Sequence, residues 1–523
     1  MSQNYLPTEP TDGFPYLWGG RFISFSAACK HFLAVGSTGS GKTVLVSLLM
    51  KEVMREIASP GLANARAFVY DSKTDLLPLI KGMGVPEEKI VVLDPFDTRV
   101  SAWDMAADIT DPMQADDVAS ILIPTDRSDN NAYFSDTARR LLAGIIEVFV
   151  DSAPGRWTLR DLVLAVKNPD RLKIILRSSE ETQDLEQHFE PSKTFASVNS
   201  TLSGHLRKYR SIAAVWHHAK SRKFSIREWM KSQQVVVLGN NAKAKEPILR
   251  LNSLIFSEVA KEILSNPGRS SAENWLFLDE FGDLGELNSL VDLMKLGRSK
   301  GASVVLGTQD IADIDFVYGK DRSRTILGNA QNLGIVHINS SQPETQAWAS
   351  EVVGEQQYIR EDRSESESTT SKGESTSGKT TNYNYVTERA WLPSMFSSNL
   401  PPTDDVVGLS GLFRIGSTFF EQHIPADILF GSRGKWNRFP EPDKGYPRHV
   451  PHPDNSNFKL PDWTHDDIDR LGIDELRLFL NPQNATKEEI RPPEESQPPE
   501  ESGPPEESLP PIDPLEGMAY NNQ

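Results

Sequence analysis

The chain has 523 residues, 38% of them hydrophobic, which is enough for two or three domains with a large buried core. Its single cysteine, Cys29, excludes an intramolecular disulfide, and its longest apolar run, residues 141–150, is too short to cross a bilayer and contains Glu147. The net charge of −18 is concentrated at the C-terminus, because residues 487–523 carry −8 and leave −10 on the preceding 486 residues. We therefore expect a cytoplasmic globular protein with no membrane span of its own and an acidic C-terminal segment.

The first predicted core strand covers residues 32–35, after a lead-in of residues 1–31 that contains Pro and Gly turn signals. A phosphate-loop pattern and then a helical pattern follow this strand. The loop consists of Gly36, Ser37, Thr38, Gly39, Ser40, Gly41, Lys42 and Thr43. Glycines let backbone N–H groups approach a polyphosphate, Lys42 can reach the outer phosphates, and Thr43 can ligate Mg²⁺. We predict an ATP-binding site here; the alternative is a glycine-rich turn that caps the helix and binds nothing.

Two further apolar runs, residues 65–70 and 90–93, stop at the polar residues Asp71 and Asp94. Strands that are nearly continuously apolar and are separated by helical patterns indicate a parallel sheet covered on both faces. Residues 32–105 are therefore interpreted as the first part of a nucleotide-binding domain.

From about residue 106 to residue 227 the pattern is helical with few strand signals, which predicts an all-helical insertion domain. Within it, residues 205–223 contain six Lys and Arg residues and no acidic residue. These cations are Arg207, Lys208, Arg210, Lys220, Arg222 and Lys223. They can form a surface that contacts DNA phosphates independently of sequence, or an ordinary solvated helix face, and both interpretations stay open.

The sheet resumes over residues 228–440, the second part of the nucleotide-binding domain. The strands expected here cover residues 235–238, 275–278, 303–308 and 333–338, with helices over roughly 246–265 and 286–299. The order predicts an α/β fold of the P-loop NTPase (RecA-like) type, a doubly wound and mostly parallel sheet with an inserted all-helical domain.

The strand over 275–278 closes on two adjacent carboxylates, Asp279 and Glu280, in a Walker B pattern. A buried strand of this kind can deliver Asp279 to Mg²⁺ and leave Glu280 beside the terminal phosphate to activate water. Gln309, at the end of the next strand, can sense the γ-phosphate or orient the attacking water. Taken alone, each pattern also fits a strand that simply ends in a polar loop.

Several segments together carry a family resemblance. They are GSTGSGKT, VYDSKTDLL, VLDPFD with Trp103 soon after, FLDEFGDLGELNSLVDLMKLGRSKGASVVLGTQD, and NAQNLGIVHINSSQPETQAWASEVVG. In wording and spacing the chain resembles the TraD/TraG coupling ATPases of conjugation and type IV secretion, within the FtsK/HerA motor group, over about residues 30–430. It departs from them at DSKTD, where the family often has DPKGE, and it retains Lys73.

The resemblance implies a cytoplasmic homo-hexameric ring motor that couples ATP hydrolysis to moving DNA, with its relaxase, into a secretion channel. Lys42 and Thr43 would then hold phosphate and metal, Asp279 the metal, Glu280 the water, and Gln309 a sensor role. The resemblance also places an arginine at position 298, where Arg298 would act as an arginine finger on the neighbouring subunit; the alternative is an arginine at a helix C-terminus that interacts with its own helix dipole. Such proteins usually begin with transmembrane helices, whereas 35 residues without a spanning segment precede Gly36, so we expect any membrane link to be peripheral and to come from a partner.

The C-terminal third contains three further features. A Ser/Thr-rich stretch, residues 358–384, is predicted to be a flexible loop, and residues 406–416 can add edge strands to the sheet. Residues 441–486 are interpreted as a linker with an amphipathic helix over 464–480. In residues 487–523 the sequence PPEES occurs three times, which predicts a disordered acidic tail that is either a spacer or a docking segment for the DNA-processing partner.

Two functions of other classes remain open from the sequence. One is a nucleotide-gated adaptor that does not hydrolyse ATP, and the other is a motor for protein cargo alone. Stimulation of ATP turnover by DNA would separate both from a DNA-translocating coupling protein.

Overall fold

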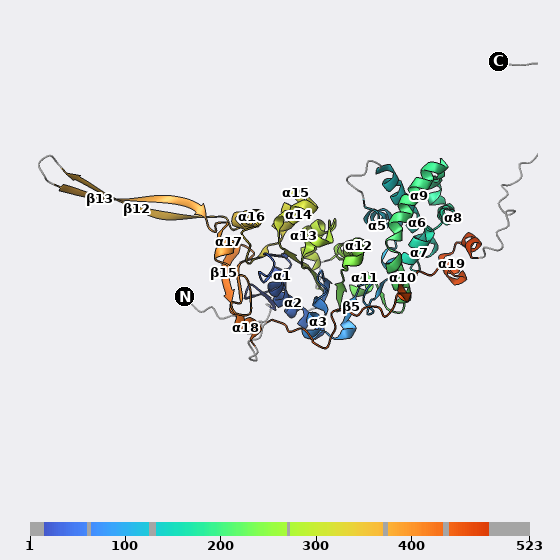
Figure 1. Cartoon of the computed structure of the whole chain (residues 1–523), viewed down its shortest axis with the longest axis horizontal. Helices are drawn as coiled ribbons and strands as arrows, with labels where there is room; N and C mark the ends of the chain where they lie inside the picture. Colours follow the sequence, from blue (N-terminus) through green and yellow to red (C-terminus); the bar gives the residue numbers. More distant parts are fainter. Residues whose placement is uncertain are drawn as a thin grey trace, which may run out of the picture. The chain divides into compact units, whose positions relative to one another are not determined.

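A nine-stranded sheet forms the centre of the molecule (Figure 1). The computed structural model describes residues 15–59, 64–124, 132–268, 272–369, 375–431 and 439–480. In spatial order the strands are β15 (Thr418–Ile424), β14 (Leu409–Ile415), β11 (Asn332–Ile335), β3 (Phe32–Val35), β10 (Ala302–Thr308), β9 (Ala272–Leu278), β4 (Asn64–Tyr70), β8 (Val235–Leu238) and β5 (Ile90–Val92). The strands from β11 to β5 are parallel, and β14 and β15 extend the sheet in antiparallel fashion.

Helices connect and cover the strands. The α-helices are α1 (Phe25–Ala28), α2 (Lys42–Ala58), α3 (Leu76–Gly82), α4 (Met105–Asp108), α5 (Ala115–Leu122), α6 (Ala132–Ser152), α7 (Leu159–Ala165), α8 (Pro169–Arg177), α9 (Ser192–Arg207), α10 (Arg210–His218), α11 (Ile226–Trp229), α12 (Lys245–Ser265), α13 (Leu290–Leu296), α14 (Ile311–Tyr318), α15 (Lys320–Asn329), α16 (Pro343–Val353), α17 (Met395–Ser398), α18 (Ala426–Phe430) and α19 (His465–Leu471). The 3₁₀ turns are η1 (Glu87–Lys89), η2 (Pro112–Gln114), η3 (Glu180–Phe189), η4 (Ala242–Ala244), η5 (Phe281–Leu284), η6 (Gly297–Lys300), η8 (Ser456–Phe458) and η9 (Asp474–Phe479).

Alternate side chains of β4 show that both faces of the sheet are buried. Ala67 and Val69 belong to the apolar cluster that α2 and α3 build on one face. Phe68, between them, points to the other face, where its ring centroid lies 6.3 Å from that of Phe256 on α12 and 6.3 Å from that of Trp229. Cover on both faces is what the nearly continuous apolar strands predicted.

The lead-in contributes to the core. Its described part contains the hairpin of β1 (Tyr16–Trp18) and β2 (Arg21–Ile23). The ring of Tyr16 lies 4.6 Å from that of Trp275 on β9, and the ring of Trp18 lies 4.8 Å from that of Phe32 on β3. These aromatic pairs join the first hairpin to the strands on either side of β10.

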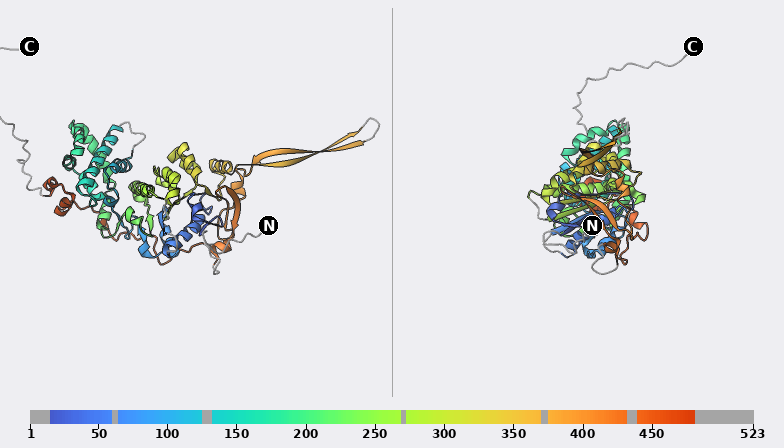
Figure 2. Two further views of the ribbon diagram at one scale, coloured as in Figure 1. Left: turned by 180° about the vertical axis from the view of Figure 1, so that it is seen from behind. Right: turned by 90° about the vertical axis from the view of Figure 1, so that its left-hand side faces the viewer.

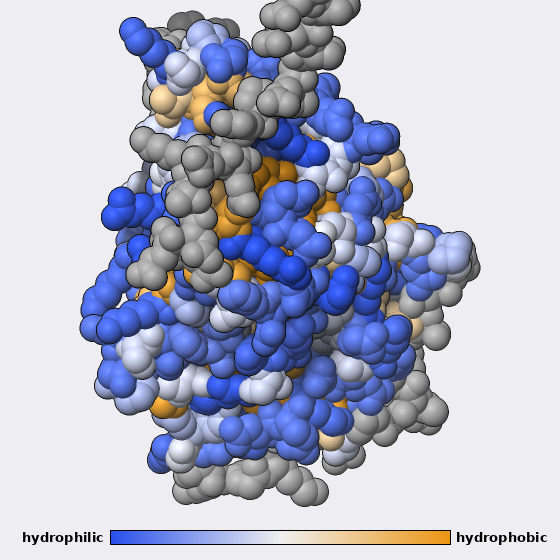
Figure 3. Space-filling model, turned by 90° about the vertical axis from the view of Figure 1, so that its right-hand side faces the viewer, coloured by the Kyte–Doolittle hydropathy of each residue, from blue (hydrophilic) through white to orange (hydrophobic). Residues whose placement is uncertain are grey.

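Helices α5 to α10 form the helical part of the molecule, between β5 and β8 in the chain (Figure 1). Residues such as Leu141, Leu142, Ile145 and Phe149 bury one side of α6, as their helical spacing requires. The chain enters and leaves this part side by side, because β6 (Ala102–Trp103) pairs in parallel with β7 (Lys223–Phe224). Seen from the right-hand side of Figure 1, the surface is largely hydrophilic, and apolar residues show mainly in recesses (Figure 3).

The structure corrects the secondary structure predicted for the loop over 358–384, because the residues that it describes there, 358–369 and 375–384, belong to two paired strands. β12 (Glu355–Thr369) and β13 (Ser375–Arg389) form an antiparallel ribbon that projects from the sheet beyond α16 and α17 (Figures 1 and 2). The prediction of a loop rested on the Ser/Thr-rich composition of this stretch, which is low in apolar residues. An antiparallel ladder satisfies backbone groups without a core, and pairs such as Ile359 opposite Tyr385 suit β-strands.

Two predicted helices are shorter in the structure. The helix expected over 464–480 ends at Leu471, because Gly472 follows with φ 72°, a left-handed conformation that stops an α-helix; η9 continues the chain. The helix expected over 286–299 is α13 followed by η6, which turns at Gly301 (φ 73°) into β10.

Residues 439–463 run along the molecule as a strap. The backbone of Val450 accepts a hydrogen bond from Thr98 N and donates one to Asp97 Oδ2, and Asp462 forms ion pairs with Lys167 and Arg171 of the helical part. The compact unit to which all contacts described here belong ends at Leu476. The predicted acidic tail, 487–523, lies outside the described residues. Among those residues, none of the helices combines the length and the apolar character that crossing a membrane requires.

Candidate functional site

The phosphate loop lies at the carboxyl end of β3, held by its two neighbouring strands. Gly36 N donates to Thr308 O at the end of β10, and Ser37 N donates to His337 O just after β11. Gly41 caps α2 with φ 94°, and a Cβ there would lie 2.1 Å from the Thr403 hydroxyl. The turn therefore requires glycine at position 41 both for its backbone angle and for space.

Asp279 follows the last residue of β9 and faces the start of α2. The Thr43 hydroxyl donates to Asp279 Oδ2 at 3.2 Å, and the neighbouring strand approaches so closely that a Cβ on Gly307 would lie 2.5 Å from Asp279 Oδ1. Only 8% of Asp279 is exposed, and burial raises the pKa of its carboxyl. The second oxygen, Oδ1, is buried and has no hydrogen-bond partner among the described residues.

Glu280 contacts both Lys42 and Gln309. Its Oε2 lies 3.1 Å from Lys42 Nζ and accepts a 2.6 Å hydrogen bond from Gln309 Nε2, while Oε1 accepts one from Gln309 N at 3.3 Å. The backbone of Glu280 is left-handed, with φ 70°, a conformation that costs energy in a residue other than glycine and that aims the side chain toward the phosphate loop. Gln309 also accepts a 2.7 Å hydrogen bond from Thr38, which closes a chain of contacts from the loop to Glu280.

The residues around Asp279 fit a magnesium ion. The buried, unpartnered carboxylate oxygen and the Thr43 hydroxyl are hard oxygen ligands of the kind that Mg²⁺ takes. Within the described ranges, no three His, Cys, Asp or Glu side chains gather as a metal-binding group. A magnesium ion held here would therefore take its remaining ligands from water and from nucleotide phosphates, as this ion commonly does.

Sequence reasoning missed Gln342, the residue that precedes α16. Its amide Nε2 donates to Gln309 O at 3.0 Å, and its Oε1 accepts from the Ser37 hydroxyl, which in turn accepts from Asn339 N at 2.7 Å. Gln342 thus joins the phosphate loop to the segment that carries Gln309. A Gln-Pro step at a helix start was visible in the sequence, but nothing in it indicated these partners.

Sequence reasoning also missed the outer wall of the site. A cavity of about 410 Å³ runs along the phosphate loop and is lined on its far side by Lys73, Thr403, Asp404, Asp405 and Phe430. The Thr403 hydroxyl donates to Ser40 O at 2.8 Å and so ties this wall to the loop. Of these residues, only Lys73 belongs to a segment on which the family resemblance rests, VYDSKTDLL.

Arg298 lies away from the other predicted site residues of the same chain. It is exposed in η6, which leads into the first residue of β10, whereas Gln309 follows the last. The seven residues of β10 span roughly 20 Å, so Arg298 and Gln309 lie near opposite ends of this strand. The structure brings together Lys42, Thr43, Asp279, Glu280 and Gln309, but not Arg298.

Three of the six cations of the basic stretch are engaged by other segments of the chain. Lys208 pairs with Glu246 at 2.7 Å, Lys223 pairs with Asp104 at 2.9 Å, and Arg222 donates to Thr98 O. Arg207 and Arg210 line a cavity between α7, α9 and α10. Spacing along the sequence could not separate paired from unpaired cations, because the acidic partners belong to other segments.

A phosphate loop between a parallel strand and a helix, facing a carboxylate pair with one strand between them, defines the class: the chain is a P-loop NTPase. A family model described as "type IV secretion-system coupling protein DNA-binding domain" matches residues 16–405. The chain therefore belongs to the family of type IV secretion-system coupling proteins.

Relatives and solved structures agree with this family. Coupling protein TraD of Escherichia coli (strain K12) is 22% identical over 306 residues, which are 57% of this chain and 40% of TraD, so the match spans about two fifths of TraD. The bacterial conjugative coupling protein TrwBdeltaN70 superposes with a TM-score of 0.63 at 22% identity, over 84% of this chain and 92% of that one. TrwB in complex with ADP and Mg²⁺ gives a TM-score of 0.63 at 21% identity, over 86% and 94%.

Proposed function

We propose that this protein is an ATP-driven, DNA-translocating coupling protein that links a relaxase–DNA substrate to a type IV secretion or conjugation channel. The observation that carries the proposal is the contact of Glu280 with Lys42 and Gln309, inside a chain whose match to the coupling-protein family spans both the nucleotide site and the helical part. An adaptor without catalysis would have no need for a carboxylate at this position.

ATP and Mg²⁺ are the ligands that we assign to the site. The structures of TrwB with ADP and Mg²⁺, and with a non-hydrolysable ATP analogue, support this assignment. Lys42 and the N–H groups of residues 36–43 would hold the phosphates, and Thr43 with Asp279 would hold the metal, whose charge neutralises the phosphates when bound. Arrival of phosphate draws Lys42 away from Glu280, because both anions compete for one ammonium group.

Glu280, once released from Lys42, is the general base for the attacking water. Gln309 holds Glu280 through two hydrogen bonds and reaches the loop through Thr38, so it can set the orientation of the carboxylate according to the state of the loop. This arrangement gives Gln309 a positioning role.

We further propose a cytoplasmic homo-hexamer that reaches the membrane through a channel component, with relaxase or another DNA-processing protein as partner. The acidic segment 487–523 is the proposed docking site for that partner, because many weak contacts of ten carboxylates suit a basic surface.

The test is ATP hydrolysis by the full chain with and without DNA, alongside the mass of the assembly. We expect turnover that rises when single-stranded or duplex DNA is added. Turnover without any response to DNA would favour a motor for protein cargo, and no turnover at all would favour the adaptor. A chain truncated after residue 486 should keep the DNA response and lose capture of the relaxase.

A further inference from the structure

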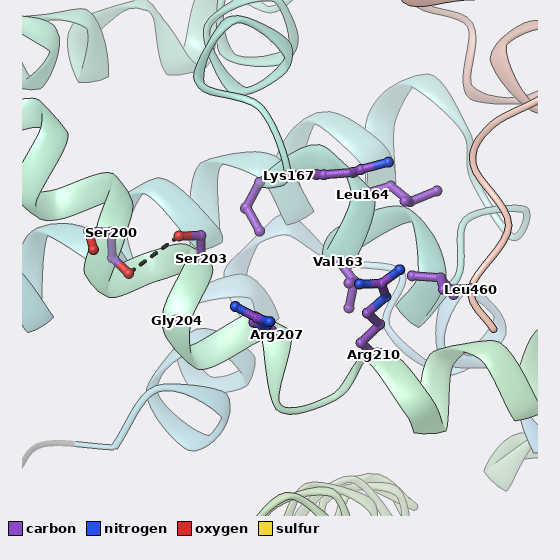
Figure 4. Close-up of a pocket in the computed structure, with 10 residues that line it drawn as sticks. Val163, Leu164, Lys167, Ser200, Ser203, Gly204, Arg207, Arg210 and Leu460 are labelled. Atoms are coloured by element: carbon purple, nitrogen blue, oxygen red, sulfur yellow. Dashed lines mark hydrogen bonds between the residues drawn. The ribbon is translucent and has the colours of Figure 1, made fainter. Parts of the chain in front are cut away.

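A cavity of about 410 Å³ lies in the helical part, remote from the phosphate loop in the sequence. Helix α9 and the start of α10 form one side, the C-terminal end of α7 forms the other, and Leu460 of the strap closes one end (Figure 4). Four aliphatic residues make the apolar part of its lining: Val163, Leu164, Val166 and Leu460.

The polar part of the lining is cationic. Arg207 and Arg210 point from the α9–α10 side into the space below α7 (Figure 4). Both are exposed, and neither forms an ion pair with any described residue. Lys167, the third cation, is paired with Asp462 at 2.7 Å. Hydroxyls of Ser200 and Ser203 add hydrogen-bonding groups beside the guanidinium groups.

Two unpaired guanidinium groups over an aliphatic floor are unusual in a chain whose net charge is −18. The combination complements a ligand that is anionic on one side and apolar on the other. A nucleotide in a single strand is such a ligand, because its phosphate is charged and the face of its unstacked base is apolar. In a duplex the bases are stacked inside the helix, so only phosphates could reach the cavity.

We propose that this cavity is a subsite for one unstacked nucleotide of single-stranded DNA. Arg207 and Arg210 bind the phosphates on either side of that nucleotide, and the base lies against the aliphatic floor. No aromatic ring lines the cavity, so the base packs on aliphatic side chains and does not stack on a ring. Because no base-edge contact is required, binding is independent of sequence. The inference rests on the proposed function, since it takes DNA as the cargo.

Gly204 allows the cavity to be filled without removing a charge. It lies on α9 at the cavity wall, and a Cβ added there meets no atom within 4 Å. Leucine favours a helix more than glycine does, so Gly204→Leu is expected to fold. The charge variant is Arg207→Ala with Arg210→Ala, and the matched control is Lys193→Ala, an exposed cation on the same helix outside the cavity lining.

The experiment measures binding of labelled oligothymidylate, and of a duplex of the same length, to the full chain over a range of salt concentrations. Gly204→Leu should weaken oligothymidylate binding about tenfold and leave duplex binding unchanged, since only an unstacked base needs the cavity. The double Arg variant should lower the slope of log affinity against log salt for the single strand by about 1.4, the loss of two phosphate contacts. Lys193→Ala should leave the difference between the two DNA forms unchanged.

Equal losses for duplex and single strand in Gly204→Leu, or no loss at all, would overturn the subsite while leaving the proposed function intact. If the unmodified chain bound neither form of DNA, the proposed function itself would fail. If a labelled acidic peptide lost affinity in the cavity variants and labelled oligothymidylate did not, the cavity would be a site for a protein segment and the proposal would be wrong.

Discussion

Glu280 forms contacts that a bound nucleotide would have to rearrange. Its carboxylate lies 3.1 Å from the ammonium group of Lys42. In the proposed mechanism, however, Lys42 binds phosphate and Glu280 activates water. The left-handed backbone of Glu280 and its two hydrogen bonds from Gln309 hold the side chain close to this position when Lys42 moves away. The residue that we propose as the general base is therefore already held at the site before nucleotide arrives.

The two residues should give different phenotypes when changed. Lys42→Ala removes the cation that holds phosphate and should abolish most nucleotide binding, whereas Glu280→Gln should keep ATP bound and lower turnover by about 10²-fold or more, because only the base is lost. Nucleotide binding and steady-state hydrolysis, measured on the same preparations, check both. Normal turnover in Glu280→Gln would remove Glu280 from the mechanism.

At this scale the sequence predicted which residues would meet at the site better than it predicted the contacts that link them to the rest of the chain. Lys42, Thr43, Asp279 and Glu280 belong to local patterns with a fixed relation to a strand end, so their meeting at one edge of the sheet followed from the parallel topology. Gln342 could not be found in this way, because its contact with Ser37 joins residues 305 positions apart through a loop conformation that no local pattern encodes.

At the scale of elements, His31 joins α13 to the sheet. Its Nε2 lies 2.9 Å from Met294 O at the end of α13, and its Nδ1 accepts from Val304 N on β10 at 3.2 Å, so the ring is neutral with the proton on Nε2. Burial, with the charge of Arg298 acting in the same direction, lowers the pKa of His31 to about 4. The ring is 2% exposed.

This histidine should make the protein less stable in mild acid. In the unfolded chain it titrates near pH 6.5, so its stabilising contribution is fully present above that pH and is lost as the pH falls through about 4. The difference corresponds to roughly 3 kcal/mol in the free energy of unfolding. His31→Asn, which tolerates the left-handed backbone at φ 57°, should flatten the pH dependence between 6.5 and 4 in denaturant titrations. An unchanged slope would mean that His31 titrates normally.

The order of strands and helices was largely predictable, whereas their ends and the ribbon were not. Strands such as β4 and β9 are buried on both faces, and their composition alone identifies them. The ribbon of β12 and β13 has exposed residues on both faces, with Tyr383 at 68% and Tyr385 at 74% on one face and the exposed Asn384 between them on the other, so burial left no pattern in its sequence. Gly472 ends α19 through its left-handed backbone conformation. A glycine within a helical sequence pattern does not by itself predict that the helix ends there.

At the scale of the whole molecule, Arg298 requires a second subunit to have a catalytic role. It lies near the end of β10 opposite to that of Gln309, away from its own Glu280, but a guanidinium exposed there can face the nucleotide of a neighbour in a ring. The alternative is a local role at the end of α13, where a cation interacts favourably with the helix dipole.

Mixed rings distinguish these roles. Arg298→Ala and Lys42→Ala subunits should each be nearly inactive alone, the former by about 10³-fold if the arginine acts in trans. Mixing them should restore some hydrolysis, because some interfaces then pair an intact Lys42 site with an intact Arg298. Rings verified as mixed by mass that show no recovery would leave Arg298 with its local role.

Neighbouring strands of the sheet are far apart in the order of synthesis. β3 pairs with β10 and β11, which emerge from the ribosome more than 250 residues later, and β4 pairs with β8 and β9, more than 150 residues later. The helices between β6 and β7 are contiguous in the chain and can pack before β8 is made. The phosphate loop is therefore synthesised early and assembled late, and until translation reaches β10 the apolar strand β3 has to be kept from pairing with the wrong partner.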